Sequence, residues 1–499
     1  MPLIPPPAAP TQPRPVPAWR RLATSGLSLA LAACAPMSPL VPAPAVAASA
    51  AVSPVAPVAI EGARGPVSAA RSQQIVENLK ANPGQPESIL DRHLAIESAV
   101  TGSPLVADNA VTLLQDGDAT YRAMFEAIAK AKHHINMETY ILQDDETGRR
   151  FADALIAKRQ QGLQVNVLHD SVGTIDTPAA FFDRLKAAGI RVVEYNPVNP
   201  LQAKSGWDIN ERDHRKLLVV DGEVAFLGGI NISAVYSSGS APKKRPKAPP
   251  PAASAASATS ASADSSNEGR PWRDTDVRIE GPVVAELQKI FLDTWVRQKG
   301  EPLNTADYLP ARRQARDKHV VRAIASSPDE SYSAIYATLM SSIDHAEKEI
   351  LITMAYFVPD AQLVGALSRA AQRGVDVRLI LPRHSDAKLV LSAGRAQYGA
   401  LLESGVKLYE RRTVLLHAKS AVIDGVWSTV GSANLDWRSF LHNQELNAVV
   451  LGDEFGAQMQ KAFARDLAQS DPVTLQAWNQ RPLGERLRGW LGQLLQYWL

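Results

Sequence analysis

One pattern of residues occurs twice in this chain, and it constrains the fold more than any other feature. Each copy has a histidine, a lysine two positions later, an aspartate after four more residues, then six residues and a segment that runs from glycine to asparagine: His214, Lys216, Asp221 and Asn231, then His417, Lys419, Asp424 and Asn434. Only 10 of the 499 residues are histidines, so two matches with identical spacing are not a coincidence. The chain therefore contains two copies of one unit.

The segments around the two motifs repeat in the same order. Each copy begins with a strand, a helix and a second strand: 135–140, 151–159 and 165–168 in the first, and 350–357, 361–372 and 377–380 in the second. Another helix, a glycine and an extended segment follow in both. This alternation predicts an α/β protein with two related half-domains, which we place at residues 87–300 and 301–480.

The motif spacing suits a catalytic strand end followed by a tight turn. Residues two apart on a strand share a face, so each histidine should project beside its lysine. The Asp-Gly dipeptides at 221–222 and 424–425 are typical of hairpin turns, so we interpret Asp221 and Asp424 as structural. The returning strand then brings Asn231 or Asn434 back to the histidine and lysine.

Two such units placed face to face would combine two imidazoles, two ammonium groups and two amides, a set that fits a phosphodiester. One neutral imidazole attacks phosphorus, and the lysines and asparagines stabilise the charge on the phosphate oxygens. The second imidazole protonates the leaving alkoxide and then deprotonates an alcohol or water. We expect no metal and no cofactor, because the lysine charges take the place of divalent ions.

Each imidazole also needs an acceptor at Nδ1 to fix its tautomer. Glu445 follows the second motif and lies seven residues before Gly452, and Asp274 lies seven residues before Gly281. Alignment of the two copies through these glycines predicts Asp274 and Glu445 as equivalent residues that orient the histidines.

The residues around these motifs resemble the phospholipase D superfamily, and specifically its bacterial cardiolipin synthase branch. The resemblance spans about 118–466 and is carried by the paired motif and by three segments, 213–221, 272–282 and 431–439. It implies two α/β/α half-domains packed face to face with pseudo-twofold symmetry and an active site at their interface. It also implies transfer of a phosphatidyl group between phospholipids, such as phosphatidylglycerol or phosphatidylethanolamine, with His214 as nucleophile and His417 as acid and base.

The amino-terminal segment predicts export from the cytoplasm. Arg20 and Arg21 precede a short apolar run that ends in Leu31-Ala32-Ala33-Cys34, the only cysteine in the chain. This segment is similar to a bacterial lipoprotein signal, whose cysteine becomes lipid-modified, although a simple secretory signal is the alternative. We therefore expect a signal peptide over 1–34, an Ala/Pro-rich disordered tether over 35–86, and a lipid anchor on the periplasmic side of the inner or outer membrane.

Two further segments bear on lipid contact. A Ser-, Ala- and Pro-rich insert at 237–270 interrupts the first copy and contains a basic run at 243–247, which is either a solvated loop or a site for anionic headgroups. The last residues, 481–499, have an amphipathic helical pattern that suits either a membrane interface or packing on the second half-domain.

Charge and chemistry separate the alternatives. The chain has 53 Lys and Arg against 51 Asp and Glu, which disfavours a nuclease of the same superfamily. A hydrolytic phospholipase D remains possible, because water and an alcohol attack the same intermediate. A non-catalytic scaffold would usually have lost part of one motif, whereas both are complete here. The sequence indicates no particular oligomeric state.

Overall fold

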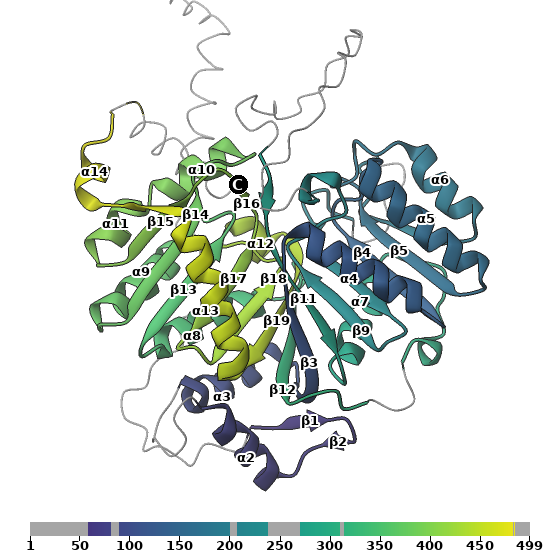
Figure 1. Ribbon diagram of the computed structural model, residues 1–499, viewed down its shortest axis with the longest axis horizontal. Coiled ribbons are helices and arrows are strands. Elements are labelled where there is room, and N and C mark those ends of the chain that lie inside the picture. The colour runs from purple at the N-terminus through teal and green to yellow at the C-terminus, as the bar shows by residue number, and fades with distance from the viewer. Residues whose placement is uncertain are drawn as a thin grey trace, which may run out of the picture. The chain divides into compact units, whose positions relative to one another are not determined.

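The protein is represented by a computed structural model, which describes residues 58–80, 89–199, 207–237, 270–309, 314–482 and 484 (Figure 1). The first half contains β3 (Leu105–Gln115), α4 (Asp116–Lys130), β4 (His134–Thr139), α5 (Glu146–Gln160), β5 (Gln164–Asp170), α6 (Ala179–Ala187), β6 (Arg191–Tyr195), β7 (Arg212–Asp213), β8 (Lys216–Val220), β9 (Val224–Gly228), η2 (Ala234–Tyr236), β10 (Trp272–Arg273), β11 (Thr275–Glu280) and α7 (Val284–Arg297).

A 3₁₀ turn, η3 (Thr305–Asp307), precedes the second half. That half contains β12 (His319–Ser326), α8 (Ala334–His345), β13 (Glu349–Met354), α9 (Ala361–Gln372), β14 (Asp376–Pro382), α10 (Lys388–Arg395), α11 (Tyr398–Glu403), β15 (Lys407–Arg411), β16 (Leu415–Leu416), β17 (Lys419–Ile423), β18 (Trp427–Gly431), α12 (Trp437–Leu441), β19 (Asn443–Leu451), α13 (Asp453–Ala468), β20 (Ser470–Val473) and α14 (Leu475–Asn479).

The strands of the two halves pair in the same order. The first half runs β6-β5-β4-β8-β9-β11-β3, and the second runs β15-β14-β13-β17-β18-β19-β12, with β20 added beside β15. In each half, three consecutive strands are parallel, and the strand that follows the motif histidine runs antiparallel to the first of them. The predicted α/β class is confirmed by this arrangement.

Equivalent local signals form equivalent elements. Helix α9 begins where the Asp360 side chain accepts a hydrogen bond from the Leu363 amide, and α5 begins in the same way at Asp145 with the Gly148 amide. Gly162 and Gly374 follow these two helices with φ of 93° and 95°, a conformation that favours glycine and that turns the chain into the next strand.

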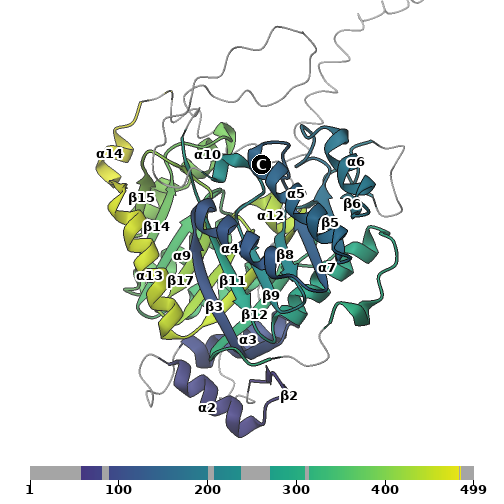
Figure 2. The same cartoon turned by 45° about the vertical axis from the view of Figure 1, so that its right-hand side comes forward.

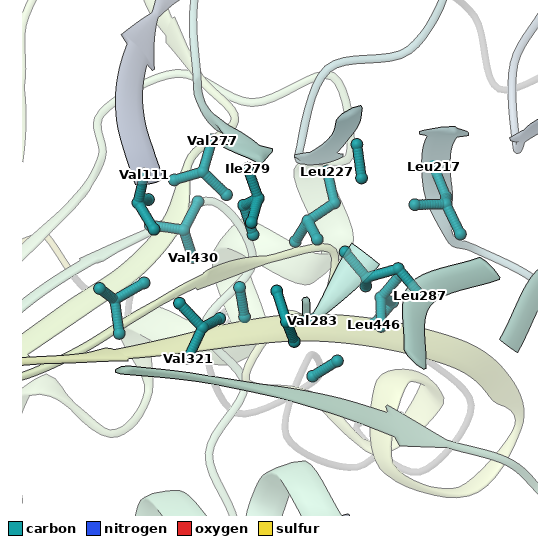
Figure 3. Close-up of a cluster of buried hydrophobic side chains, with 14 of the residues drawn as sticks. Val111, Leu217, Leu227, Val277, Ile279, Val283, Leu287, Val321, Val430 and Leu446 are labelled. Carbon is teal, nitrogen blue, oxygen red and sulfur yellow. The ribbon is translucent and has the colours of Figure 1, made fainter. Parts of the chain in front are cut away.

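A shared hydrophobic core joins the two halves. Figure 3 shows side chains from both sheets and from α7 in one cluster, among them Val111, Leu227, Val321, Val430 and Leu446. Strand β3 of the first half also pairs with β12 of the second half. The two sheets, and with them the strand ends beside the motif histidines, therefore pack around one core.

The prediction of a disordered tether across 35–86 is wrong for its described part. Residues 58–80 form β1 (Ile60–Gly62), β2 (Gly65–Pro66) and α2 (Ala69–Leu79), and α3 (Ile89–Thr101) follows. Ile60 is buried and pairs with β3, and the Ser68 side chain caps α2. The weak local pattern concealed this order because the partner of β1 is a strand more than forty residues away.

Several predictions lie outside the described residues. They are the signal segment with Cys34, most of the insert and nearly all of the predicted helix at 481–499. In the portion that the structure does describe, none of the helices is long and apolar enough to cross a membrane.

Candidate active site

The two motif histidines lie where each half-domain pairs with the other. Short strand β7 runs beside the start of β19, and the His214 amide donates to the Gln444 carbonyl at 3.0 Å. In the same way β10 runs beside β16, and the His417 amide donates to the Arg273 carbonyl at 2.8 Å. Each histidine thus lies in a short break between two strands, rather than within the strand that the spacing predicted.

The carboxylates cross between the halves. His214 Nδ1 lies 3.0 and 3.1 Å from the two carboxylate oxygens of Glu445, which belongs to the second half. His417 Nδ1 lies 2.7 Å from Asp274 Oδ2 in the first half. A proton on Nδ1 donated to a carboxylate leaves Nε2 as the nucleophilic or proton-accepting nitrogen. The repeat alignment predicted these two carboxylates as equivalent residues, and the structure places each beside the other copy's histidine.

The motif glycine and serine account for a difference between the copies. Ser432 Oγ donates to Glu445 Oε2 at 2.5 Å, and the Asn443 side chain donates to Glu445 Oε1 at 3.3 Å. Gly229 occupies the position of Ser432 in the first copy, and a Cβ there would overlap the Asp274 carboxylate. Asp274, whose side chain is shorter than that of Glu445, instead accepts from the backbone amide of Thr275 at 2.7 Å.

The two lysines lie beside their histidines, as the spacing predicted. Lys216 Nζ donates to the His214 carbonyl, and Lys419 Nζ donates to the His417 carbonyl at 2.5 Å. All four side chains are nearly enclosed, with His214 and His417 only 8% and 6% exposed. In their charged form, the two lysine ammonium groups can bind an anionic ligand such as phosphate.

Burial dominates the ionisation of the site. It lowers the pKa of His214 to about 4, against the opposing effect of Glu445, and it lowers the pKa of Lys216 to about 7. Burial also lowers the pKa of His417, with a further contribution from Lys419. Burial alone would raise the pKa of Glu445, but His214 and Lys216 bring it down to about 2. Both histidines are therefore neutral at pH 7 in the ligand-free site, and an anionic phosphate favours their protonation.

The charge of each lysine also reaches the other half. Lys419 contributes to the lowered pKa of His214, after burial and the nearer groups, and Lys216 does the same for His417. The structure thus brings both His-Lys pairs into one electrostatic environment.

The two asparagines differ in their contacts. Asn231 Oδ1 accepts from the Ile141 amide at 3.0 Å, and its Nδ2 donates to the Tyr236 hydroxyl at 2.9 Å. Asn434 Oδ1 is buried without a protein partner among the described residues. Phosphate binding by these amides stays a prediction, and Asn231 would have to exchange its tyrosine partner to take part.

Asp221 and Asp424, predicted as structural residues, both accept hydrogen bonds from backbone amides. The Asp221 carboxylate accepts from the backbone amides of Lys132, His133 and His134 at 2.8 to 2.9 Å. Asp424 accepts from three consecutive amides, 347–349, at 2.7 to 3.0 Å. Both aspartates have positive φ, 56° and 53°, in the turn after the motif strand.

Aromatic side chains around the histidines were missed by the sequence analysis. The Tyr140 ring packs on His214 at 5.1 Å between centroids. His417 contacts three rings, those of Trp272, Tyr236 and Tyr356, at 5.1, 5.7 and 6.1 Å. The signal available was proximity in sequence: Trp272 lies two residues before Asp274, and Tyr236 five residues after Asn231.

Comparison with known proteins agrees with this geometry. The family model described as "Cardiolipin synthase, PLD-like domain" matches residues 124–238 and 339–467, one match in each half. Cardiolipin synthase from Geobacillus thermodenitrificans is 34% identical over 405 residues, which cover 81% of this chain and 74% of that protein. The chain belongs to the cardiolipin synthase family of phospholipase D-like proteins. The predicted family, and with it the class of phospholipase D-superfamily phosphatidyltransferases, is confirmed.

Other members and one solved structure support the same assignment. Cardiolipin synthase from Alkalihalophilus pseudofirmus is 32% identical over 387 residues, covering 77% of this chain and 71% of that protein. The crystal structure of phosphatidylserine synthase from Haemophilus influenzae matches with a TM-score of 0.58 at 15% identity, covering 81% of this chain and 99% of that chain. This last likeness shows that the cardiolipin synthase family member described here shares the fold of that enzyme.

Proposed function

We propose that this protein transfers a phosphatidyl group between two phospholipids and forms a cardiolipin-type product through a phosphohistidine. The observation that carries the proposal is the crossed site, in which each histidine is oriented by a carboxylate from the other half. Two imidazoles with opposite roles, His214 neutral and His417 protonated once the anionic phosphate is bound, and two buried lysines are the groups that a two-step displacement at phosphorus requires.

In the first step, Nε2 of His214 attacks the phosphorus of the donor phospholipid. A P–N bond forms as the P–O bond to the leaving headgroup breaks, and His417, which is protonated when the anionic phosphate binds, transfers the proton on Nε2 to that oxygen and becomes neutral. Lys216 and Lys419 offset the charge that grows on the non-bridging oxygens. Glu445 holds Nδ1–H of His214 and stabilises the positive charge that this imidazole acquires.

In the second step, the neutral His417 removes a proton from the hydroxyl of an acceptor phospholipid. The resulting oxygen attacks phosphorus, the P–N bond breaks, and His214 is restored. Water in place of the hydroxyl yields phosphatidic acid by the same route. Donor lipids such as phosphatidylglycerol or phosphatidylethanolamine fit this chemistry.

Product analysis tests the proposal. The purified full-length protein is incubated with phosphatidylglycerol vesicles, and the lipids are identified by mass spectrometry. A dimeric phospholipid is expected, and phosphatidic acid alone would show that the enzyme is a hydrolase.

The histidine roles are tested by substitution. His214→Ala and His417→Ala should each lower turnover by about 10³-fold or more, because each removes the nucleophile or the acid-base group. His133→Ala, an exposed histidine outside the site, is the matched control and should retain full activity. Wild-type turnover in either catalytic variant would refute the two-half site.

We also propose that the protein works at a membrane surface, attached through lipid-modified Cys34 on the periplasmic side. The lipoprotein-like segment 20–34 supports this placement. Cells supplied with a labelled fatty acid should incorporate label into the protein, and Cys34→Ser should abolish incorporation. Equal labelling of the wild type and of Cys34→Ser would show that Cys34 is not the site of lipid attachment.

A further inference from the structure

A small number of large hydrophobic side chains lie exposed on the described part of the molecule, and their placement is not even. Five are exposed by more than a third of their surface: Ile96, Ile175, Ile209, Val296 and Leu389. Three of them, Ile175, Ile209 and Leu389, lie in connections at the sheet edge that bears the histidines, and they are 65%, 51% and 57% exposed.

The pairing of the strands shows why these connections share an edge. Strands β4, β5 and β6 are parallel, and β8 starts at Lys216 beside Thr139, the last residue of β4. The carboxyl ends of β4, β5 and β6 therefore lie at the edge where His214 is held, and the same register places the ends of β13, β14 and β15 beside His417. Figure 1 and Figure 2 show α6 and α10, which follow β5 and β14, on the same upper side.

Ile175 and Leu389 each lie within three residues of a position that contacts an aromatic residue beside a motif histidine. Ile175 belongs to the turn after β5, where Gly173 packs against the Tyr140 carbonyl, and the Tyr140 ring packs on His214. Leu389 is the second residue of α10 and lies three residues after Asp386, whose carboxylate accepts from the Tyr356 hydroxyl at 2.6 Å beside His417.

Ile209 completes the set between the two halves. It lies five residues before His214, and its neighbour Asn210 accepts from Arg438 of the second half at 3.3 Å through both its backbone and side-chain oxygens. Half-buried Trp207 in the same segment donates to the Pro197 carbonyl at 2.8 Å. Tryptophan is enriched at membrane-water interfaces, because its ring is largely apolar and its N–H is polar.

We propose that Ile175, Ile209 and Leu389 form an active-site rim that inserts into the surface of a phospholipid bilayer and presents the headgroups to the histidines. The inference rests on the proposed function, because the reacting phosphorus of a phospholipid lies in the headgroup layer. Two nearly buried imidazoles reach that layer only if the edge that surrounds them touches it. The three exposed aliphatic side chains would enter the apolar layer beneath the headgroups, where loss of their contact with water is favourable.

The experiment compares two physical forms of one substrate with the full-length protein. Turnover of phosphatidylglycerol in vesicles is measured beside turnover of dihexanoyl phosphatidylglycerol below its critical micelle concentration. In the triple variant Ile175→Ser, Ile209→Ser, Leu389→Ser, the vesicle lipid concentration for half-maximal turnover should rise about tenfold or more, because apolar surface no longer enters the bilayer. Turnover of the monomeric lipid should change by less than about twofold, since no rim side chain contacts the reacting atoms.

Ile96→Ser is the matched control. Ile96 is 40% exposed on α3, which lies on the lower side in both views, away from α6 and α10. This variant should match the wild type with both substrates.

The outcomes are distinct. If the triple variant needs the same vesicle lipid concentration for half-maximal turnover as the wild type, the proposal of a docking surface is overturned and the proposed function is left intact. If the wild-type protein turns over neither substrate, the proposed function itself is refuted. If the triple variant loses both activities, the three single variants decide, and the proposal fails unless at least one loses vesicle turnover selectively. A change from dimer to monomer in sedimentation, with equal loss on both substrates, would assign the rim to a contact between two copies and overturn bilayer docking.

Discussion

At the scale of single residues, the crossed carboxylates make the sharpest prediction. Glu445→Gln and Asp274→Asn should each lower kcat by about 10²- to 10⁴-fold, because a neutral amide does not stabilise the imidazolium and can donate its NH2 to Nδ1, which favours the wrong tautomer. Steady-state kinetics on the monomeric phosphatidylglycerol measures both effects. A silent Asp274 variant would show that the first-half carboxylate has no part in the reaction.

Lys216 makes a prediction about pH. Burial lowers the pKa of its ammonium group to about 7, so the group is charged below this pH and loses its proton as the pH rises. The charged form stabilises phosphate, so kcat/KM, which reports the free enzyme, should fall tenfold per unit above about pH 7. In Lys216→Arg the guanidinium stays charged, and this alkaline decline should disappear from whatever activity remains. A flat wild-type profile from pH 6 to 9 would contradict the assignment.

At the scale of elements, the two motif aspartates hold each catalytic strand to its neighbours. The carboxylate of Asp221 is the shared acceptor for three amides at the start of β4. Asp221→Ala should lower the free energy of unfolding by about 1–2 kcal/mol, as loss of a helix-cap acceptor does. Urea denaturation measures the loss, and Asp424→Ala should give a similar value because its three hydrogen bonds are equivalent.

The same turns distinguish structure from catalysis. An Asp221→Ala variant that remains folded should retain far more activity than His214→Ala. In the wild type, the Asp221 carboxylate accepts from backbone amides and not from the imidazoles of His214 and His417. Loss of activity equal to that of the histidine variant, with an unchanged unfolding curve, would contradict the structural role.

At the scale of the whole molecule, one core serves both half-domains. Leu446 is buried in that core and follows Glu445 directly in β19. Leu446→Ala should destabilise the protein by about 2–5 kcal/mol through the cavity that it leaves. Differential scanning calorimetry should record one unfolding transition for the whole protein, and this transition should move to lower temperature in the variant. Two separate transitions would show that the halves unfold independently.

Much of the fold could be read from the chain because its signals are local and repeated. The predicted helix at 361–372 has the bounds of α9, and the strands predicted at 165–168 and 377–380 lie within β5 and β14. Histidine, lysine and aspartate in one spacing predicted the reacting groups, and the Asp-Gly dipeptides predicted the turns that the structure shows. The order in 58–80 was missed because a three-residue strand such as β1 depends on its partner β3 and has little pattern of its own.

The sequence by itself determined the family, the repeated α/β unit and the identity of the histidines, lysines and carboxylates, because these follow from residue type and spacing. Only the tertiary structure decided that Glu445 serves His214 and Asp274 serves His417, and that aromatic rings enclose His417. The two carboxylate contacts join residues more than a hundred positions apart across a pseudo-twofold interface. No local pattern distinguishes a partner in the same copy from its equivalent in the other, because the repeat makes the two candidates alike.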